Sequence, residues 1–117
     1  MKKQILLLAV VSAAIFACKK NDHQHPIPFK SACLNNKIAQ FQQDDNLCTT
    51  GATVKKYQFQ NKDVYVFDLG PCGADFFSEV IDDSCNILGN LNGIAGNQVI
   101  NGANFGSATY VSTVWSN

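Results

Sequence analysis

The chain has 117 residues, with nine lysines, nine acidic residues and no arginine, and its formal charge is zero. If Lys2 and Lys3 leave with a signal peptide, seven lysines remain against nine acidic residues, a net charge of about −2. A weakly acidic domain without guanidinium groups lacks the basic surface that phosphate backbones require, so we expect no nucleic-acid binding.

The N-terminus has the pattern of a bacterial lipoprotein signal. Lys2 and Lys3 precede an apolar run over residues 5–16, which is shorter than the roughly 20 residues that span a bilayer. Residues 15–18, Ile-Phe-Ala-Cys, resemble a lipobox, although Phe16 departs from its usual middle residue. We therefore expect a signal peptide over residues 1–17 and a lipid on Cys18 in the outer membrane, facing the periplasm or the surface. The alternative is an ordinary secretory signal cut after Ala14 or Ala17.

A polar stretch over residues 18–28 follows the predicted anchor. It carries His23, His25, Pro26 and Pro28 and lacks the apolar content of a packed segment, so we expect a flexible tether. A His-x-His pair can bind metal weakly, but we expect His23 and His25 to be solvated residues of the linker. Residues 29–117 then form one small domain, of a size at which cross-links commonly supplement the core.

The cysteines support an exported chain. With Cys18 set aside, four remain, and an even number in an oxidising compartment indicates disulfides, with three connectivities open. Pairing of neighbours, Cys33–Cys48 and Cys72–Cys85, is favoured because it closes two short loops, each worth about 3 kcal/mol in the chain-entropy model. A zinc site of four thiolates needs C-x-x-C pairs, and the sequence has none.

The first predicted element is a helix capped by Ser31. Leu34, Ile38 and Phe41 follow the helical i, i+4, i+7 spacing, and the helix should stop near Gln43.

Residues 54–69 predict an antiparallel hairpin with Asn61 and Lys62 at its tip. Phe59 should then lie opposite Val64, and Tyr57 opposite Val66. These four side chains should form the apolar face that the helix covers.

The second half of the domain is predicted from turn signals. Residues 70–73 break the sheet, residues 74–78 form a short turn, and residues 79–81 and 85–88 form a second hairpin turned by residues 82–84. Asn92-Gly93 and Asn101-Gly102 favour type I′ hairpins within residues 89–106, with an irregular loop as the alternative. Residues 109–115 predict a closing strand, with Tyr110 or Trp115 sealing the core. The fold class is therefore α+β, an N-terminal helix packed on a small antiparallel sheet of hairpins and held by two disulfides.

Several spaced motifs resemble a family of small cysteine-containing lipoprotein domains of unknown function from Bacteroidota. The matching residues are Cys33, Leu34, Lys37, Ile38, Phe41, Tyr57, Val64, Tyr65, Phe67, Pro71, Cys72, Phe77, Asp82, Cys85 and Asn86. Members of that family carry further cysteines and a Gly-Gly-x-x-Gly segment, where this chain has Leu88, Gly89 and Asn92-Gly93. The resemblance implies a fold and a location at the cell envelope, and it implies no catalytic residues.

Composition argues against catalysis. Both histidines precede residue 29, which excludes serine–histidine and cysteine–histidine mechanisms unless the tether folds back. Paired carboxylates remain as an alternative for glycoside hydrolysis, from Asp68, Asp75, Glu79, Asp82 and Asp83. Calcium binding by Asp82, Asp83 and Asn86 lacks the spacing of an ordered calcium loop, so a turn is the preferred explanation. No metal and no cofactor is expected.

The sequence thus predicts a non-catalytic binding module, held at the membrane by its lipid, for an unknown protein or glycan. Its candidate binding residues are Pro71, Gly73, Tyr65, Tyr110 and Trp115, because sugar and protein sites use solvent-facing aromatic residues. Burial of the three aromatic residues would argue against a glycan. The alternatives are a small carboxylate-based hydrolase and a protease inhibitor with a protruding loop at residues 71–73.

Overall fold

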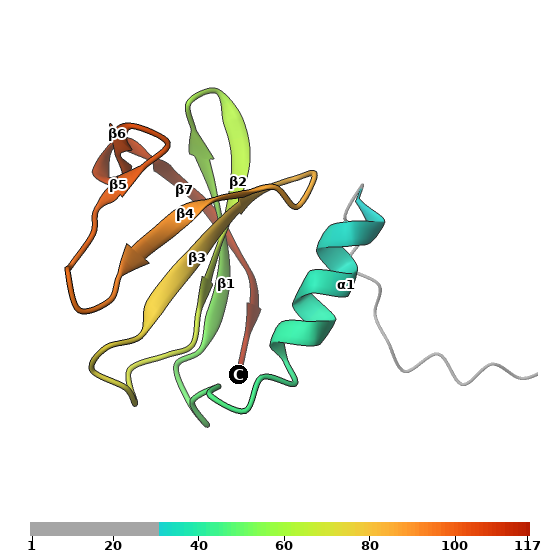
Figure 1. The fold of residues 1–117 in the computed structure, drawn as a ribbon. Coiled ribbons are helices and arrows are strands. Elements are labelled where there is room, and N and C mark those ends of the chain that lie inside the picture. The colour runs from blue at the N-terminus through green and yellow to red at the C-terminus, as the bar shows by residue number, and fades with distance from the viewer. Residues whose placement is uncertain (1–30) are drawn as a thin grey trace, which may run out of the picture.

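The computed structural model describes residues 31–117, which form one helix and a curled antiparallel sheet (Figure 1). The predicted signal peptide, the lipid site Cys18 and the tether over residues 18–28 lie outside the described residues. The elements in chain order are α1 (Ala32–Phe41), β1 (Thr53–Phe59), β2 (Lys62–Asp68), β3 (Phe77–Asp82), β4 (Ile87–Asn92), β5 (Val99–Ile100), β6 (Ala103–Asn104), the 3-10 turn η1 (Phe105–Ser107) and β7 (Thr109–Ser116). The predicted α+β class, with a helix, antiparallel hairpins and two disulfides, is confirmed.

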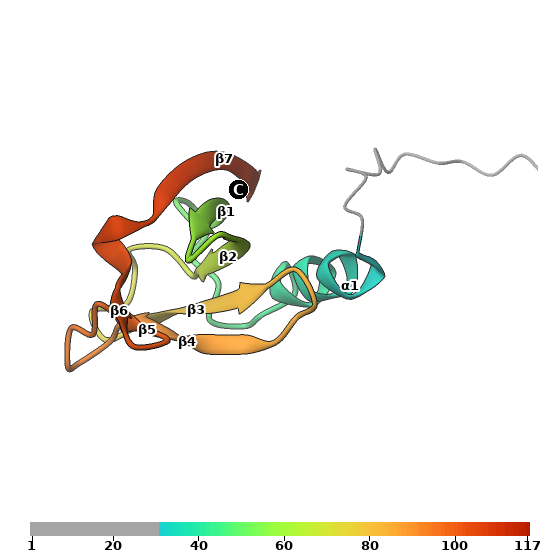
Figure 2. The same cartoon turned by 90° about the horizontal axis from the view of Figure 1, so that it is seen from above.

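The main sheet has the order β4-β3-β2-β1-β7, and β5 and β6 form a separate pair. Seen from above, β7 arches over β1, while α1 lies beside the tips of β3 and β4 (Figure 2). The last strand pairs with β1, so the C-terminal segment closes the sheet as predicted. Within it Trp115 packs against the core, whereas Tyr110 is exposed.

The helix follows its predicted pattern. Ser31 is the N-cap, and its hydroxyl accepts a hydrogen bond from the backbone N–H of Leu34. Leu34 and Ile38 are buried, and Phe41 is half-buried. The helix ends at Phe41, two residues before the predicted Gln43.

The tip of the first hairpin lies one residue earlier than predicted. Phe59 pairs with Lys62 and Tyr57 with Val64, so Gln60 and Asn61 form the turn, with φ values of 50° and 61°. A two-residue turn of this kind needs positive φ at both central positions, and Asn61, which tolerates that conformation, takes the second of them in place of the predicted first. The register moves by two residues, which leaves every side chain on its predicted face.

The helix covers the opposite face from the one predicted. Tyr57, Phe59, Val64 and Val66 belong to a cluster that is closed by the C-terminal segment through Ile100 and Phe105. The residues that meet α1 are Val54, Tyr65, Phe67 and Ile81. The prediction failed because β2 is apolar on both faces, from Val64 to Phe67, so its pattern does not show which face the helix takes. We call the two sides the helix face and the C-terminal face.

The segment rich in asparagine and glycine contains ordered turns. Asn101 and Gly102, with φ values of 49° and 79°, form the predicted two-residue turn between β5 and β6. At Asn92 the hairpin prediction was too tight, since Asn92 pairs with Asn97 and four residues form the loop between them. The predicted turn over residues 74–78 is also shorter, because Phe77 and Ser78 already belong to β3.

Candidate functional site

Both disulfides join elements that are distant in the sequence. The bonds are Cys33–Cys85 and Cys48–Cys72, so the predicted pairings Cys33–Cys48 and Cys72–Cys85 are wrong. Each end of α1 lies beside a different loop of the sheet. Cys33, at the start of α1, meets the β3–β4 turn, and Cys48, after α1, meets the loop that follows β2. Loop closure favours neighbouring cysteines in an unstructured chain, whereas in the folded domain the position of α1 decides which cysteines meet.

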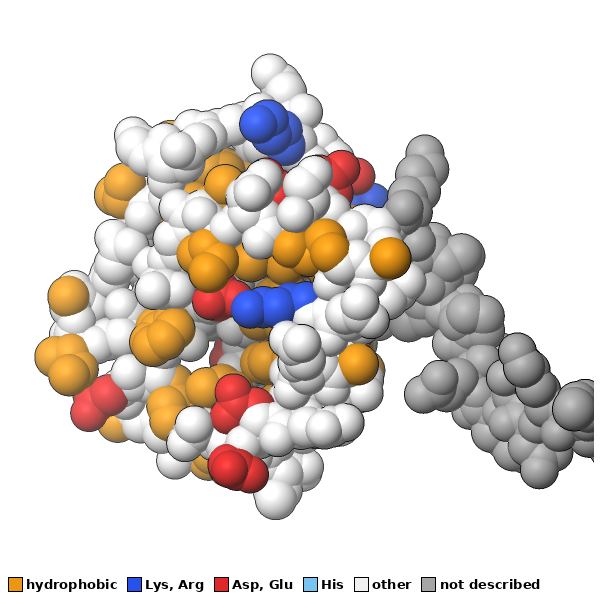
Figure 3. Space-filling model, turned by 45° about the vertical axis from the view of Figure 1, so that its right-hand side comes forward, with side chains coloured by type: hydrophobic (Ala, Val, Ile, Leu, Met, Phe, Trp, Pro, Cys, Tyr) orange, Lys and Arg blue, Asp and Glu red, His pale blue; other side chains and the backbone are white. Residues whose placement is uncertain are grey.

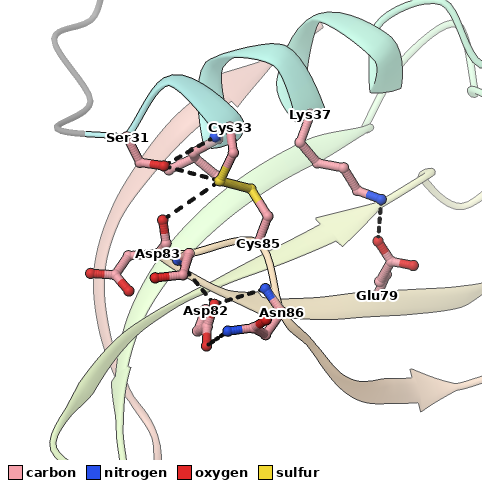
Figure 4. The surroundings of a disulfide bond; sticks show 10 residues. Ser31, Cys33, Lys37, Glu79, Asp82, Asp83, Cys85 and Asn86 are labelled. Carbon is pink, nitrogen blue, oxygen red and sulfur yellow. Dashed lines mark hydrogen bonds and ion pairs between the residues drawn. A yellow bond between two sulfur atoms is a disulfide. The ribbon is translucent and has the colours of Figure 1, made fainter.

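The Cys33–Cys85 bond is set in an ordered turn (Figure 4). Cys85 has a φ of 64°, and the turn that contains it is held by Asp82. Asp82 Oδ1 accepts hydrogen bonds from the backbone N–H groups of Ser84 (3.0 Å) and Asn86 (2.8 Å), and Oδ2 accepts one from Asn86 Nδ2 (3.0 Å). Burial alone would raise the pKa of Asp82, but these hydrogen bonds together outweigh burial and lower the pKa below 3.8. The carboxylate of Asp82 therefore stabilises the turn, which is the role that the sequence favoured for it in preference to binding calcium.

A cleft of about 500 Å³ lies between the second half of α1, the end of β2 and the start of β3. We call it the α1–β3 cleft. Its volume is within the range of ligand sites, roughly 300–1,000 Å³. Four phenylalanines contribute to its lining, Phe41, Phe67, Phe76 and Phe77, together with Leu69. Figure 3 shows hydrophobic side chains gathered on this side of the molecule, interspersed with acidic ones around a central basic side chain.

Four charged side chains also line the cleft, and three of them are acidic. Lys37 Nζ lies 2.7 Å from Glu79 Oε1, an ion pair that bridges α1 and β3 (Figure 4). Asp44 accepts hydrogen bonds from Asn46 in the turn after α1. Asp75 makes no hydrogen bond or ion pair with the other residues described here. The cleft therefore has an excess of two negative charges.

The aromatic lining is held by packing on both sides of the cleft. Phe41 makes edge contacts with Phe67 and with Trp115, with ring centroids 5.2 and 5.8 Å apart. Across from it, the Phe76 ring lies directly over Gly73. A Cβ at Gly73 would come within 2.5 Å of the outer atoms of that ring, so any other residue at this position would require the ring to move. Phe77 lines the cleft with 52% of its surface exposed.

The five predicted binding residues do not form one surface. Tyr65 is buried on the helix face, where burial raises its pKa above 10.0, and Trp115 is half-buried beside Phe41. Tyr110 is 53% exposed on the C-terminal face, where it packs on Tyr57. Pro71 and Gly73 line a separate hollow beside Gly51.

The aromatic residues of the cleft were not predicted as binding residues from the sequence. Phe76 lies just before β3 and Phe77 is its first residue. Two adjacent large aromatic side chains were a usable signal, because a small domain has little core in which to bury both. Of the predicted carboxylates, the cleft brings together Asp75 and Glu79. Asp68 and Asp82 hold loops through hydrogen bonds to backbone N–H groups. Among residues 31–117, no three His, Cys, Asp or Glu side chains are placed to hold a metal ion.

The fold and the cleft define a small disulfide-bonded α+β domain with an open, aromatic and acidic hollow beside its helix. The chain belongs to the family described as domain of unknown function DUF6970, whose model matches residues 39–117. That match includes every strand and the Cys48–Cys72 bond, whereas Cys33 precedes it. No curated protein and no solved structure matches the chain. In the part that the structure describes, no helix has the length and apolarity needed to cross a membrane.

Proposed function

We propose that this protein is a lipid-anchored binding module of the cell envelope, which presents the α1–β3 cleft to a partner and does not catalyse a reaction. The observation that carries the proposal is the use of cysteine. Four of the five cysteines pair in two disulfides, and the remaining one, Cys18, directly follows the apolar run of the predicted signal. Disulfides are typical of oxidising compartments, which fits an exported chain.

The same proposal includes a location in the cell. Cys18 carries a diacylglycerol and a further acyl chain such as palmitate, residues 18–28 form the tether, and the domain stands at the outer membrane, on its periplasmic or outer side. The resemblance of the sequence to lipoprotein domains from Bacteroidota supports this placement, as does the pairing of four cysteines in disulfides.

The partner is more consistent with a protein than with a glycan. Sugar sites depend on exposed Tyr and Trp side chains. Tyr65 and Trp115 pack in the core of the helix face, and Tyr110, the one of the three that is exposed, lies on the C-terminal face, away from the cleft. The cleft instead offers phenylalanine and carboxylates. Buried aromatic residues beside a polar rim are typical of protein interfaces.

The anchor is tested by mass spectrometry of the mature N-terminus, with the Cys18→Ser variant as control. We expect a diacylglycerol adduct on Cys18 and recovery of the protein in the membrane fraction, with the variant lacking both. A free N-terminus at another residue, with an unmodified Cys18 thiol, would contradict anchoring.

The absence of catalysis is tested with generic ester, peptide and glycoside substrates. Asp75 and Glu79 are the carboxylates that a hydrolase in this cleft would use, so the Asp75→Asn variant is the control. We expect no turnover by either protein. Turnover that the Asp75→Asn substitution abolishes would show that the domain is a hydrolase.

A further inference from the structure

We infer that the α1–β3 cleft binds a segment of a partner protein in which a basic side chain stands next to an apolar one. This inference rests on the proposed role as a binding module and names the chemistry of the partner. It follows from three properties of the cleft, namely its shape, its aromatic lining and its charge.

The shape and lining suit an apolar side chain. Phe77 keeps about half of its surface exposed, while Phe41 and Phe76 are half-buried along the same hollow. Exposed apolar surface that adjoins a concave, ligand-sized space is typical of an interaction site. A partner that covers Phe77 would remove this surface from water.

The charge selects a basic neighbour for that side chain. The lining includes Asp44, Asp75 and Glu79 against Lys37 alone. Because Glu79 already pairs with Lys37, Asp44 and Asp75 are the carboxylates left to meet an incoming cation. Aromatic faces also attract cations, and the guanidinium group of arginine stacks on them more often than lysine does. An anionic segment would face two uncompensated carboxylates and is disfavoured.

The net charge of the described domain is also negative. Residues 31–117 contain four lysines and eight acidic residues, so the described part attracts basic partners before contact is made. Long-range attraction alone would not depend on which carboxylate is removed. The inference therefore requires that acidic residues in the cleft matter more than equally charged residues outside it.

The test uses the full chain, purified in mild detergent, and two capped peptides titrated by calorimetry. One peptide alternates leucine with arginine, and the other has citrulline, the neutral isostere, in place of each arginine. Trp115 is the only tryptophan and contacts Phe41, so its fluorescence is a second readout. We expect the arginine peptide to bind at least about tenfold more tightly, with affinity falling as salt rises.

Substitutions on the cleft should act with opposite signs. Asp44→Asn and Asp75→Asn should each weaken binding of the arginine peptide by about threefold to tenfold. Lys37→Gln should strengthen it, because Glu79 is then released to the ligand. The matched control is Asp45→Asn, an exposed neighbour outside the cleft that changes the net charge by the same amount.

Four outcomes would overturn the inference. These are no binding of either peptide at millimolar concentration, equal binding of the citrulline peptide, an Asp45→Asn effect as large as that of Asp44→Asn, and a concentration-dependent dimer that Phe77→Ser abolishes. Equal binding of both peptides in the cleft would leave the binding module intact and remove only the preference for a basic partner. The mass of the Cys18 terminus tests the anchor separately.

Discussion

The two faces of the sheet are covered in different ways. On the C-terminal face the cover comes from the β5–β6 hairpin and the 3-10 turn η1, and Ile100 and Phe105 enter the core with 1% and 9% of their surface exposed. On the helix face the cover is a single helix of ten residues, too short to be stable alone. The helix is held by its apolar stripe, by the Lys37–Glu79 ion pair and by two disulfides, one at Cys33 near its start and one at Cys48 in the segment after its end.

That difference explains where the cleft lies. A short hairpin and a 3-10 turn can follow the sheet closely, whereas a straight helix lies on a curled sheet only over part of its length. The space left beside its second half is the α1–β3 cleft. The C-terminal face therefore contributes chiefly to stability, and the helix face combines a core with an open site.

The largest expected effect is the loss of the disulfide that holds the start of α1. Replacing Cys33 and Cys85 with serine opens a loop of 52 residues, which the chain-entropy model values at about 4 kcal/mol. We expect urea unfolding to show a loss of that order, and hydrogen exchange to speed up in α1 more than in β5 and β6. Equal acceleration on both faces would show that the helix is not a separately held cover.

A second large effect is expected on the C-terminal face. Ile100→Ala removes a fully buried side chain, and such changes cost about 2–5 kcal/mol. The neighbouring Val99 is 52% exposed, so Val99→Ala is the matched control and should cost less than about 1 kcal/mol. Thermal unfolding of the two variants measures the difference. Similar losses would mean that this segment does not close the core.

A smaller, pH-dependent effect is expected at Asp82. Its pKa is lower in the folded protein than in the unfolded chain, so its contribution to stability is present above about pH 5 and is lost as pH falls through the folded value. Asp82→Asn should cost about 1 kcal/mol at pH 7, since the charge-assisted hydrogen bonds weaken. Unfolding measured from pH 7 to pH 2 should show the variant and the parent converging at low pH. The control is Asp83→Asn, at an exposed neighbour, and a constant gap would contradict this account.

Sequence patterns predicted local structure well and the long-range arrangement less well. The Ser31 cap, the Asn101-Gly102 turn and the closing strand depend on a few adjacent residues, and each was found. The disulfide partners and the covered face depend on where α1 lies, which no local pattern of β2 encodes because its residues 64–67 are apolar on both sides.

The candidate site was predicted only in part, for a related reason. Solvent-facing Tyr and Trp were chosen by residue type, yet Tyr65 and Trp115 serve in packing. The cleft exists because the end of α1 at Phe41 lies near Phe76 and the start of β3 at Phe77, a juxtaposition across more than 30 residues. Only the Phe76-Phe77 pair carried a local hint of an aromatic side chain outside the core.

The smallest effect on stability is expected at Phe77, and it separates the cleft from the core. Phe77→Ser removes a side chain that is 52% exposed, so we expect a loss of about 1 kcal/mol or less in thermal unfolding. Tyr110→Ser is the matched control, because Tyr110 is 53% exposed on the C-terminal face. Both variants should stay folded, but only Phe77→Ser should weaken binding of the arginine peptide, by about tenfold. If both lose binding equally, the aromatic residues of the cleft have no special role, and the two faces differ only in how they are covered.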